Sequence, residues 1–118
     1  MSDPNVIGVL ARAYVDDLDA ALPLYRDLAG GEEPHRFGFG TMRLAKVGAF
    51  LVVEGADDEV RSHAATVSVR DVEVVAEAVV AHGGTLLEGP DPGPNGPRLI
   101  ARHGDGVIFE YIQLVTGR

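Results

Sequence analysis

Cysteine is absent from this chain of 118 residues, which excludes disulfides, thiolate nucleophiles and zinc or iron–sulfur sites built on cysteine. Long apolar runs are also missing, and none approaches the roughly 18 residues of a membrane span. A cytoplasmic protein is therefore expected. Because 46% of the residues are hydrophobic, the chain can bury a core, and its length fits a single domain over residues 1–118.

Positive charge is scarce. The chain has 10 Lys and Arg against 18 Asp and Glu, a formal net charge of −8. A nucleic acid or an anionic membrane requires a basic stripe, which the sequence lacks, so neither partner is expected. A neutral or cationic ligand is easier to accommodate, although the same charge also serves solubility.

The first half of the chain shows one strand, one helix and three short strands. Alternating β-forming residues predict a strand over residues 6–15. A helix begins after Asp17, which supplies an N-cap, and ends at Gly30 and Gly31. Strands are predicted at about 33–39, 41–47 and 49–54, followed by an acidic, solvated linker at about 55–62.

The second half repeats this order. A strand at 64–69 leads to Asp71, which caps a helix that ends at Gly83 and Gly84 with His82 in its last turn. Strands are predicted at 85–88, 98–102 and 107–114. The segment 90–97 holds four prolines and is expected to be a stiff loop that cannot form a central strand.

The two capping aspartates, Asp17 and Asp71, lie 54 positions apart, about half the chain. This internal repeat predicts an α+β fold of two βαβββ modules, one at about 6–55 and the other at about 63–115. Two copies cannot form a solenoid, so the modules are expected to pack about a pseudo-twofold axis as a curved mixed sheet that encloses a cup.

Residues 15–30, which begin Val-Asp-Asp-Leu, together with Glu88-Gly89-Pro90 and the closing Asp105-Gly106-Val107-Ile108-Phe109-Glu110, resemble the vicinal oxygen chelate superfamily. Glyoxalase I, extradiol dioxygenases, methylmalonyl-CoA epimerase and bleomycin-resistance proteins belong to it. The resemblance covers nearly the whole chain and implies a glyoxalase/bleomycin-resistance-like fold and a homodimer. It is weak for activity, because this fold hosts unrelated chemistries.

The resemblance also implies where a divalent metal would be held. The matching positions in the first and last strands of the modules are Leu10, Val52, Ala64 and Glu110. Of these, only Glu110 is a plausible ligand, and a catalytic metal normally takes three or more protein ligands. No metal site and no cofactor are predicted. A divalent metal stays a disfavoured alternative, in which His63, His35 or His103 would have to reach the cup.

Alternation predicts which side chains face the cup. The predicted face consists of Leu10, Arg12, Tyr14, Phe50, Val52, Glu54, Ala64, Thr66, Ser68, Ile108, Glu110 and Ile112, with Phe37 and Phe39 as an aromatic wall. Mostly apolar with a few polar groups, this is the profile of a ligand pocket. The candidate ligand-binding residues are Arg12, Tyr14, Phe37, Phe39, Phe50, Ser68, Glu110 and Ile112. Ordinary core packing of Phe37 and Phe39 is the alternative.

Glu110 lies among apolar neighbours and therefore needs a partner. Either Arg12 neutralises it as a buried ion pair, or both contact a ligand. The leading interpretation is a metal-free protein of the bleomycin-resistance type that sequesters an apolar, aromatic or cationic compound. The alternative is a lyase, isomerase, epimerase or dioxygenase with displaced metal ligands, or with Glu110 as general base. A third possibility is a cup filled by the protein's own side chains.

Overall fold

The first module is a four-stranded sheet with a helix on one face. The computed structural model describes residues 4–114, and residues 10–62 form one compact unit. The elements in order are β1 (Val6–Val15), α1 (Leu18–Leu28), β2 (His35–Phe39), β3 (Met42–Val47), β4 (Phe50–Glu54) and α2 (Asp58–Arg61). The strands lie in the order β2-β3-β4-β1, with β1 parallel to β4 and the other pairs antiparallel.

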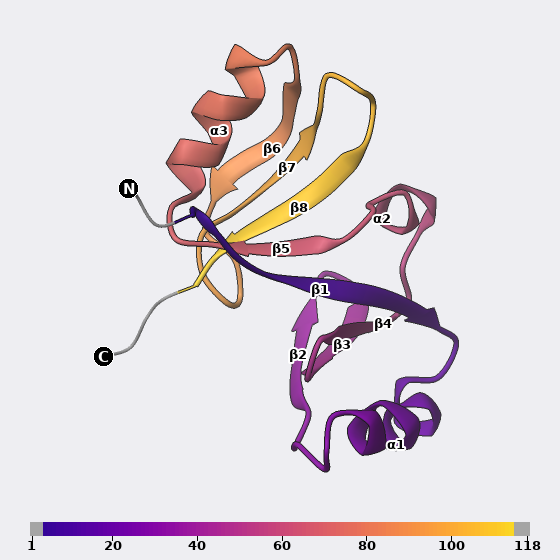
Figure 1. Cartoon of the computed structure of the whole chain (residues 1–118). Coiled ribbons are helices and arrows are strands. Elements are labelled where there is room, and N and C mark those ends of the chain that lie inside the picture. The colour runs from indigo at the N-terminus through magenta and orange to yellow at the C-terminus, as the bar shows by residue number, and fades with distance from the viewer. Residues whose placement is uncertain (1–3, 115–118) are drawn as a thin grey trace. The chain divides into compact units, whose positions relative to one another are not determined.

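The second module has the same construction. Its unit comprises residues 63–114 together with residues 4–9, the start of the chain. The elements are β5 (Thr66–Val69), α3 (Val72–Ala81), β6 (Thr85–Asp91), β7 (Arg98–Arg102) and β8 (Ile108–Gln113). Their sheet order is β5-β8-β7-β6, with β5 parallel to β8 (Figure 1). The predicted βαβββ order of elements in each half is therefore confirmed. Residues 6–9, predicted to belong to the first module, fall in the unit of the second, and residue 115 lies outside the described residues.

Each helix buries its apolar face on its own sheet. Under α1, Leu18 and Leu22 pack on Ala45, Val47 and Val52 of β3 and β4. Under α3, apolar residues of the helix pack on β5, β7 and β8, and the cluster is Val67, Val69, Val72, Val75, Ala76, Val79, Leu99, Ala101 and Tyr111. One face of each sheet is thus a helix-covered core, and the other, which we call the open face, is not covered by its helix.

The helix boundaries follow from the capping residues. Asp17 accepts a hydrogen bond from the Ala20 amide at 3.2 Å, and Asp71 accepts one from the Glu73 amide at 2.8 Å. These bonds satisfy amides that a helix start leaves without an intrahelical partner. At the other end of α3, His82 is the C-cap residue, as the sequence predicts.

We expect Asp71→Ala to lower the free energy of unfolding by about 1 kcal/mol, the usual worth of an N-cap side chain. Urea unfolding followed by circular dichroism measures it. Glu77→Ala, which removes an exposed carboxylate from the middle of the same helix, should change stability by less than about 0.5 kcal/mol. Equal losses in the two variants would contradict a capping role for Asp71.

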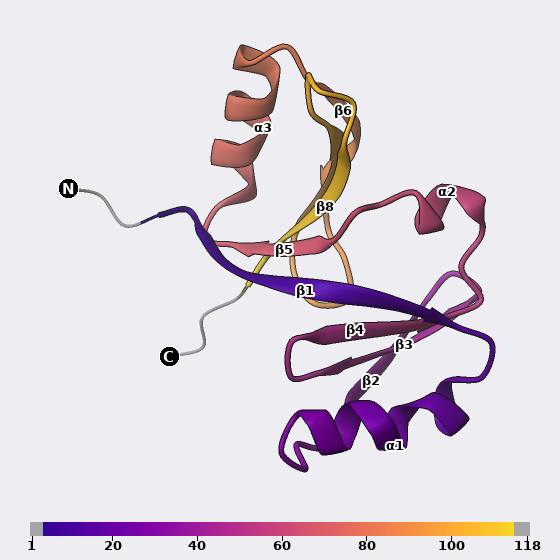
Figure 2. The same ribbon diagram turned by 45° about the vertical axis from the view of Figure 1, so that its right-hand side comes forward.

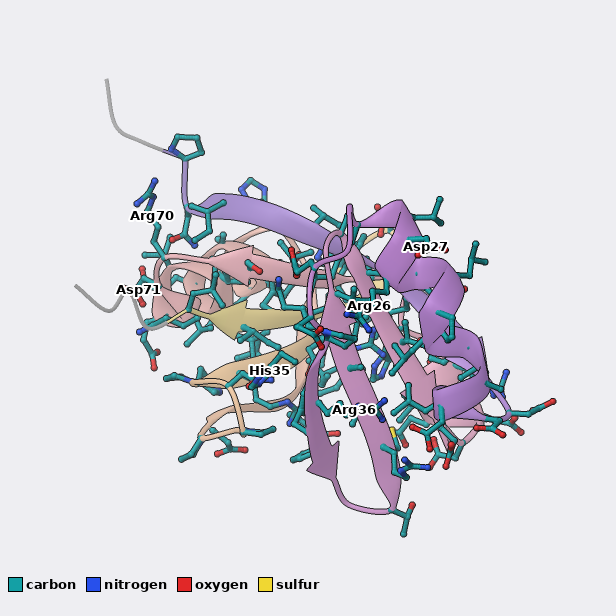
Figure 3. All side chains as sticks on the ribbon, turned by 90° about the horizontal axis from the view of Figure 1, so that it is seen from below. Arg26, Asp27, His35, Arg36, Arg70 and Asp71 are labelled. Atoms are coloured by element: carbon teal, nitrogen blue, oxygen red, sulfur yellow. The ribbon has the colours of Figure 1, made fainter. Side chains whose placement is uncertain are left out.

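Side chains also attach the start of the chain to the second module. Asn5 exchanges two hydrogen bonds with Asp71, each 3.0 Å long, and Arg70 donates to the Pro4 carbonyl at 3.0 Å. Figure 3 labels Arg70 and Asp71 at this junction. The beginning of β1 is therefore held beside the N-terminal end of α3.

Two local predictions are wrong. The acidic linker contains a short helix, α2, because Asp57 accepts from the Val60 amide at 2.9 Å and caps it. Strand β6 continues through Pro90 to Asp91, although the sequence places a loop from Pro90 onward. Strand β6 is at the edge of its sheet, where a residue without an N–H is tolerated. Within residues 4–114, no helix is long and apolar enough to cross a membrane.

Candidate functional site

Strand β8 places Glu110 on the open face of the second module. Its neighbours Phe109 and Tyr111 pack toward α3, and side chains alternate along a strand, so Glu110 points the opposite way. The pairing registers bring Thr66 of β5 and Ile100 of β7 directly beside it. Arg98, two residues before Ile100, lies on the same face and one diagonal step away.

A polar cluster is formed by three buried residues, Thr66, Arg98 and Glu110, together with the exposed Glu88. Arg98 Nε donates to Glu110 Oε2 at 3.0 Å, and Thr66 Oγ1 donates to Glu110 Oε1 at 2.9 Å. Arg98 Nη1 also donates to Glu88 Oε1 at 3.3 Å. The Arg98 and Glu110 side chains are only 10% and 12% exposed. A hydrogen bond between two oppositely charged side chains that are shielded from water is strong and directional, so it fixes the orientation of both groups.

Arg98 is the partner of Glu110 that the sequence analysis misses. The sequence does contain a signal for this partner. Arg98 is the first residue of a predicted strand and shares a face with Ile100, two residues later, and a short turn joins this strand to β8. What the sequence lacks is the register, which places Ile100 opposite Glu110 and Arg98 and Arg102 each one diagonal step away. Of the two arginines, Arg98 makes the hydrogen bond. The pairing of Glu110 with Arg12 stays a prediction.

The open face of the first module carries a second constellation, on β1 and α2. Arg12 Nη1 donates to Tyr14 Oη at 3.2 Å, and Tyr14 Oη donates to the Val60 carbonyl at 2.9 Å. The Arg61 guanidinium lies 5.4 Å from the centre of the Tyr14 ring, within cation–π range. Both predicted ligand-binding residues of β1 are thus fixed by the short helix α2.

Aromatic residues of β2 adjoin this constellation. Phe37 packs against an apolar cluster on the same face, formed by Leu44, Leu51 and Val53 with Leu10, Tyr14, Met42 and Ala56. Phe39 pairs with Met42 in the adjacent strand and is 39% exposed. The two phenylalanines share the open face, as predicted, and Phe37 belongs to its apolar core.

The prediction that Phe50, Val52 and Glu54 share this face is wrong. Phe50 and Val52 pack under α1, where the Phe50 ring meets Tyr25 with 5.0 Å between centroids. Glu54 accepts from the Leu18 amide at 2.8 Å, at the start of α1. The reason is the turn before β4: Val47 pairs with Phe50 across a two-residue turn, so both lie on the α1 side. When the alternation of a strand is counted from a start that is wrong by one residue, every side chain is assigned to the opposite face of the sheet.

The register also corrects the mapping of the metal positions. Arg12 lies 54 positions before Thr66, and Arg12 pairs with Leu51 as Thr66 pairs with Glu110. Leu51 is therefore the counterpart of Glu110 in the first module, in place of Val52. The four positions become Leu10, Leu51, Ala64 and Glu110. Leu10, Leu51 and Ala64 have no metal-binding group, and Glu110 is bonded to Arg98 and Thr66.

The histidines lie in different surroundings. His63 is buried and precedes β5, His35 is exposed and stacks on Phe37 at 5.6 Å, and His103 contacts Phe109 and Tyr111 on the α3 side. Among residues 4–114, no three His, Asp or Glu side chains gather as a group that could hold a metal ion.

Two further predicted residues belong to the open face of the second module. Ser68 is buried in β5 and pairs with Ile112 of β8, which also pairs with Arg98. Both adjoin the polar cluster, and Ile108 lies two residues before Glu110 on the same strand face. The open face of this module is thus a charged, hydrogen-bonded centre with small and apolar neighbours.

No protein-family model and no curated protein matches this chain. Solved structures do match. An uncharacterised protein from Methanosarcina mazei is 27% identical, with 96% of each chain covered and a TM-score of 0.86. Methylmalonyl-CoA epimerase from Mycobacterium tuberculosis is 16% identical over 98% of this chain and 93% of its own, with a TM-score of 0.74. A methylmalonyl-CoA epimerase solved with methylmalonyl-CoA and NH4+ is 18% identical, with 95% of each chain covered and a TM-score of 0.70. The predicted glyoxalase/bleomycin-resistance-like fold is confirmed by this likeness.

Proposed function

We propose that this protein is an isomerase of the vicinal oxygen chelate type, which moves a proton at a carbon beside a carbonyl group, as an epimerase does. The observation that carries the proposal is the carboxylate of Glu110, held by Arg98 and Thr66 on the open face. The likeness to methylmalonyl-CoA epimerases over nearly the whole chain supports this enzymatic alternative over a protein that only sequesters its ligand.

The arrangement suits proton transfer for an electrostatic reason. When Glu110 takes a proton from the carbon, the carboxylate loses its negative charge and the substrate gains one as an enolate. Arg98, which lies against Glu110, then has its positive charge next to the new anion. Thr66 fixes the orientation of the carboxylate throughout, because its hydroxyl donates to the other oxygen. Removal of the proton by one positioned group is general acid–base catalysis. Return of the proton by Glu110 to the same face gives hydrogen exchange, and inversion of the carbon requires a proton delivered to the opposite face of the enolate.

The charge of the protein bears on the choice of substrate. A net charge of −8 does not attract a polyanionic carrier such as coenzyme A, so the acyl portion of a substrate must supply the recognition. The substrate class we propose is a small carbonyl compound with an acidic hydrogen on the neighbouring carbon. Methylmalonyl-CoA, the ligand named for one similar epimerase, is the first probe.

We expect the protein to incorporate deuterium at C2 of methylmalonyl-CoA in D2O, measured by proton NMR and mass spectrometry. Glu110→Gln should reduce the exchange rate by at least about 100-fold, because general acid–base groups contribute typically that much. Addition of EDTA should leave the rate of the wild-type protein unchanged.

Glu88→Gln is the matched control, since Glu88 contacts the same arginine but its side chain is 47% exposed. It should retain exchange within a few-fold of the wild type. Folding of each variant is checked by circular dichroism at the assay temperature. Equal exchange by the wild type and a folded Glu110→Gln would refute the role of Glu110, and loss of activity with EDTA would refute a metal-free reaction.

A metal-free binding protein is the second candidate function. It is favoured by the close ion pair itself, because both oxygens of the Glu110 carboxylate already accept hydrogen bonds from side chains of the protein. In that case methylmalonyl-CoA and other carbonyl probes would show no exchange, whereas a planar cationic compound at 100 times its Kd would stabilise the protein by about 2.7 kcal/mol. A thermal-shift series separates the two candidates.

A further inference from the structure

A groove lies beside α3 on the helix-covered side of the second module, away from the polar cluster. Its volume is about 520 Å³, within the range of small-molecule sites. Residues at both ends of α3 line it: Asn5, which bonds to Asp71 before the helix, and His82, which caps its end. Figure 2 shows α3 standing beside β8 with the start of β1 at the foot of the helix. A helix of 10 residues is about 15 Å long, so the groove is elongated.

The length of the groove is apolar. Val74, Val75, Ala78 and Val79 of α3 line it together with Val6 of β1. Val6 and Val74 are 47% and 48% exposed, although both are branched apolar side chains that a ligand would shield from water. Covering this surface releases hydration water and favours an apolar occupant.

The polar end of the groove is at the C-terminal end of α3. The turn after β7 closes against the helix there: a Cβ on Gly104 would lie 2.8 Å from the His82 carbonyl oxygen. This close approach brings His103 and Asp105 beside His82. Asp105 Oδ1 accepts from the Val107 amide at 3.0 Å, which fixes the carboxylate in the turn.

Aromatic side chains form the bottom of the groove at this end, and two of them share a short hydrogen bond. His103 Nε2 and Tyr111 Oη are 2.6 Å apart, and the imidazole also lies 4.9 Å from the Phe109 ring centre. Burial raises the pKa of the Tyr111 phenol, so the phenol stays protonated at neutral pH. When it donates to His103, its oxygen keeps lone pairs that accept a hydrogen bond from a ligand.

Charge selects the ligand. Among the lining residues, all of which belong to the described part of the chain, Asp105 alone is charged when the histidines are neutral. The C-terminal end of a helix carries partial negative charge, which attracts cations. Carboxylate, phenol oxygen and helix end therefore all favour a positive group at the same place. We propose that the α3 groove binds an elongated apolar molecule with one ammonium group, placed between Asp105 and Tyr111.

The α3 groove is separate from the proposed isomerase site. Tyr111 and Glu110 are adjacent in β8 and point to opposite faces of the sheet. Variants of the groove should therefore leave the deuterium exchange unchanged, so this proposal and the proposed function are tested independently.

Three probes with the same apolar chain test the charge preference: octylammonium, octanol and octanoate, each titrated into the isotope-labelled protein and followed by NMR. We expect octylammonium to bind about tenfold more tightly than octanol, as a charge-assisted hydrogen bond would give. Octanoate should bind more weakly than octanol. Chemical-shift changes should be largest for Val74, Ala78, His103 and Tyr111.

Two variants locate the ligand. Asp105→Asn should reduce the affinity for octylammonium to that for octanol, whereas Asp91→Asn, an exposed aspartate at the end of β6 outside the groove, should leave it unchanged. Ala78→Trp should abolish binding of both compounds, because the indole fills the groove. Equal binding of octanoate and octylammonium, or equal affinity in Asp91→Asn and Asp105→Asn, would overturn the proposal.

A second copy of the chain is the competing occupant. If two α3 faces pack on each other, the wild type would be a dimer that binds none of the three probes, and Val74→Asp would make it a monomer in analytical ultracentrifugation. That result would also overturn the proposal. Binding of octylammonium without a change in the sedimentation coefficient of the protein supports the proposal.

Discussion

Replacing Arg98 by alanine is expected to lower the free energy of unfolding by about 3 kcal/mol, the usual cost of removing one member of a buried ion pair. Arg98 is 8% exposed and donates to both Glu110 and Glu88. In the variant, Glu110 loses a charged donor in surroundings where its charge is poorly hydrated, and the aliphatic part of the arginine also leaves a space. Urea unfolding measures the difference.

Two comparisons identify the cause of this loss. Glu88→Ala removes the exposed partner and should cost less than about 1 kcal/mol, as exposed ion pairs do. Arg98→Met combined with Glu110→Leu replaces both charges by apolar groups and should cost less than the sum of the single variants. A loss below about 1 kcal/mol for Arg98→Ala would contradict this expectation. It would show that the Arg98–Glu110 pair contributes little to the stability of the fold and that its role is to orient the Glu110 carboxylate.

Gly89→Ala is expected to be about as destabilising, at about 3 kcal/mol, for a reason in the backbone. Gly89 has φ +76°, and a Cβ there would lie 2.5 Å from the Arg98 carbonyl oxygen and 2.8 Å from the Asp91 amide nitrogen. The left-handed conformation costs a non-glycine residue about 1–2 kcal/mol, and overpacking adds about 1–3 kcal/mol. Thermal unfolding of the variant should show a correspondingly lower Tm.

Gly83→Ala is the matched control. It has a similar φ of +84°, but a Cβ would meet nothing within 4 Å. It should therefore cost only the conformational term, about 1–2 kcal/mol. If the two alanine variants lose the same stability, the contact between Gly89 and the strand of Arg98 is not what restricts this position.

The Gly89 and Arg98 experiments concern one structural feature. Strand β6 shifts its register against β7 between Glu88 and Asp91, and the glycine allows the close approach that this irregularity requires. The same strand pair carries Arg98 and Glu88, two members of the polar cluster. A distorted β6 is thus expected to disturb the orientation of Glu110 as well as stability.

Local signals in the sequence predict most of the elements correctly. Asp17 and Asp71 cap the two helices where the pattern of apolar residues begins, and both predicted positions are confirmed. Caps and turns depend on residues within a few positions of each other, so a single sequence contains the information. The short helix α2 was missed because four residues give no apolar period.

The sequence by itself determines the repeat of 54 residues and the two βαβββ modules. It also determines that Glu110 is a single carboxylate among apolar neighbours. Each of these features depends on spacing along the chain. Only the tertiary structure decides what Glu110 contacts. Its partner Arg98 comes from the register of β7 on β8, and Leu51 became its counterpart because a two-residue turn sends Phe50 to the α1 side. A shift of one residue reverses a strand's faces, and no local pattern in the chain specifies such a shift.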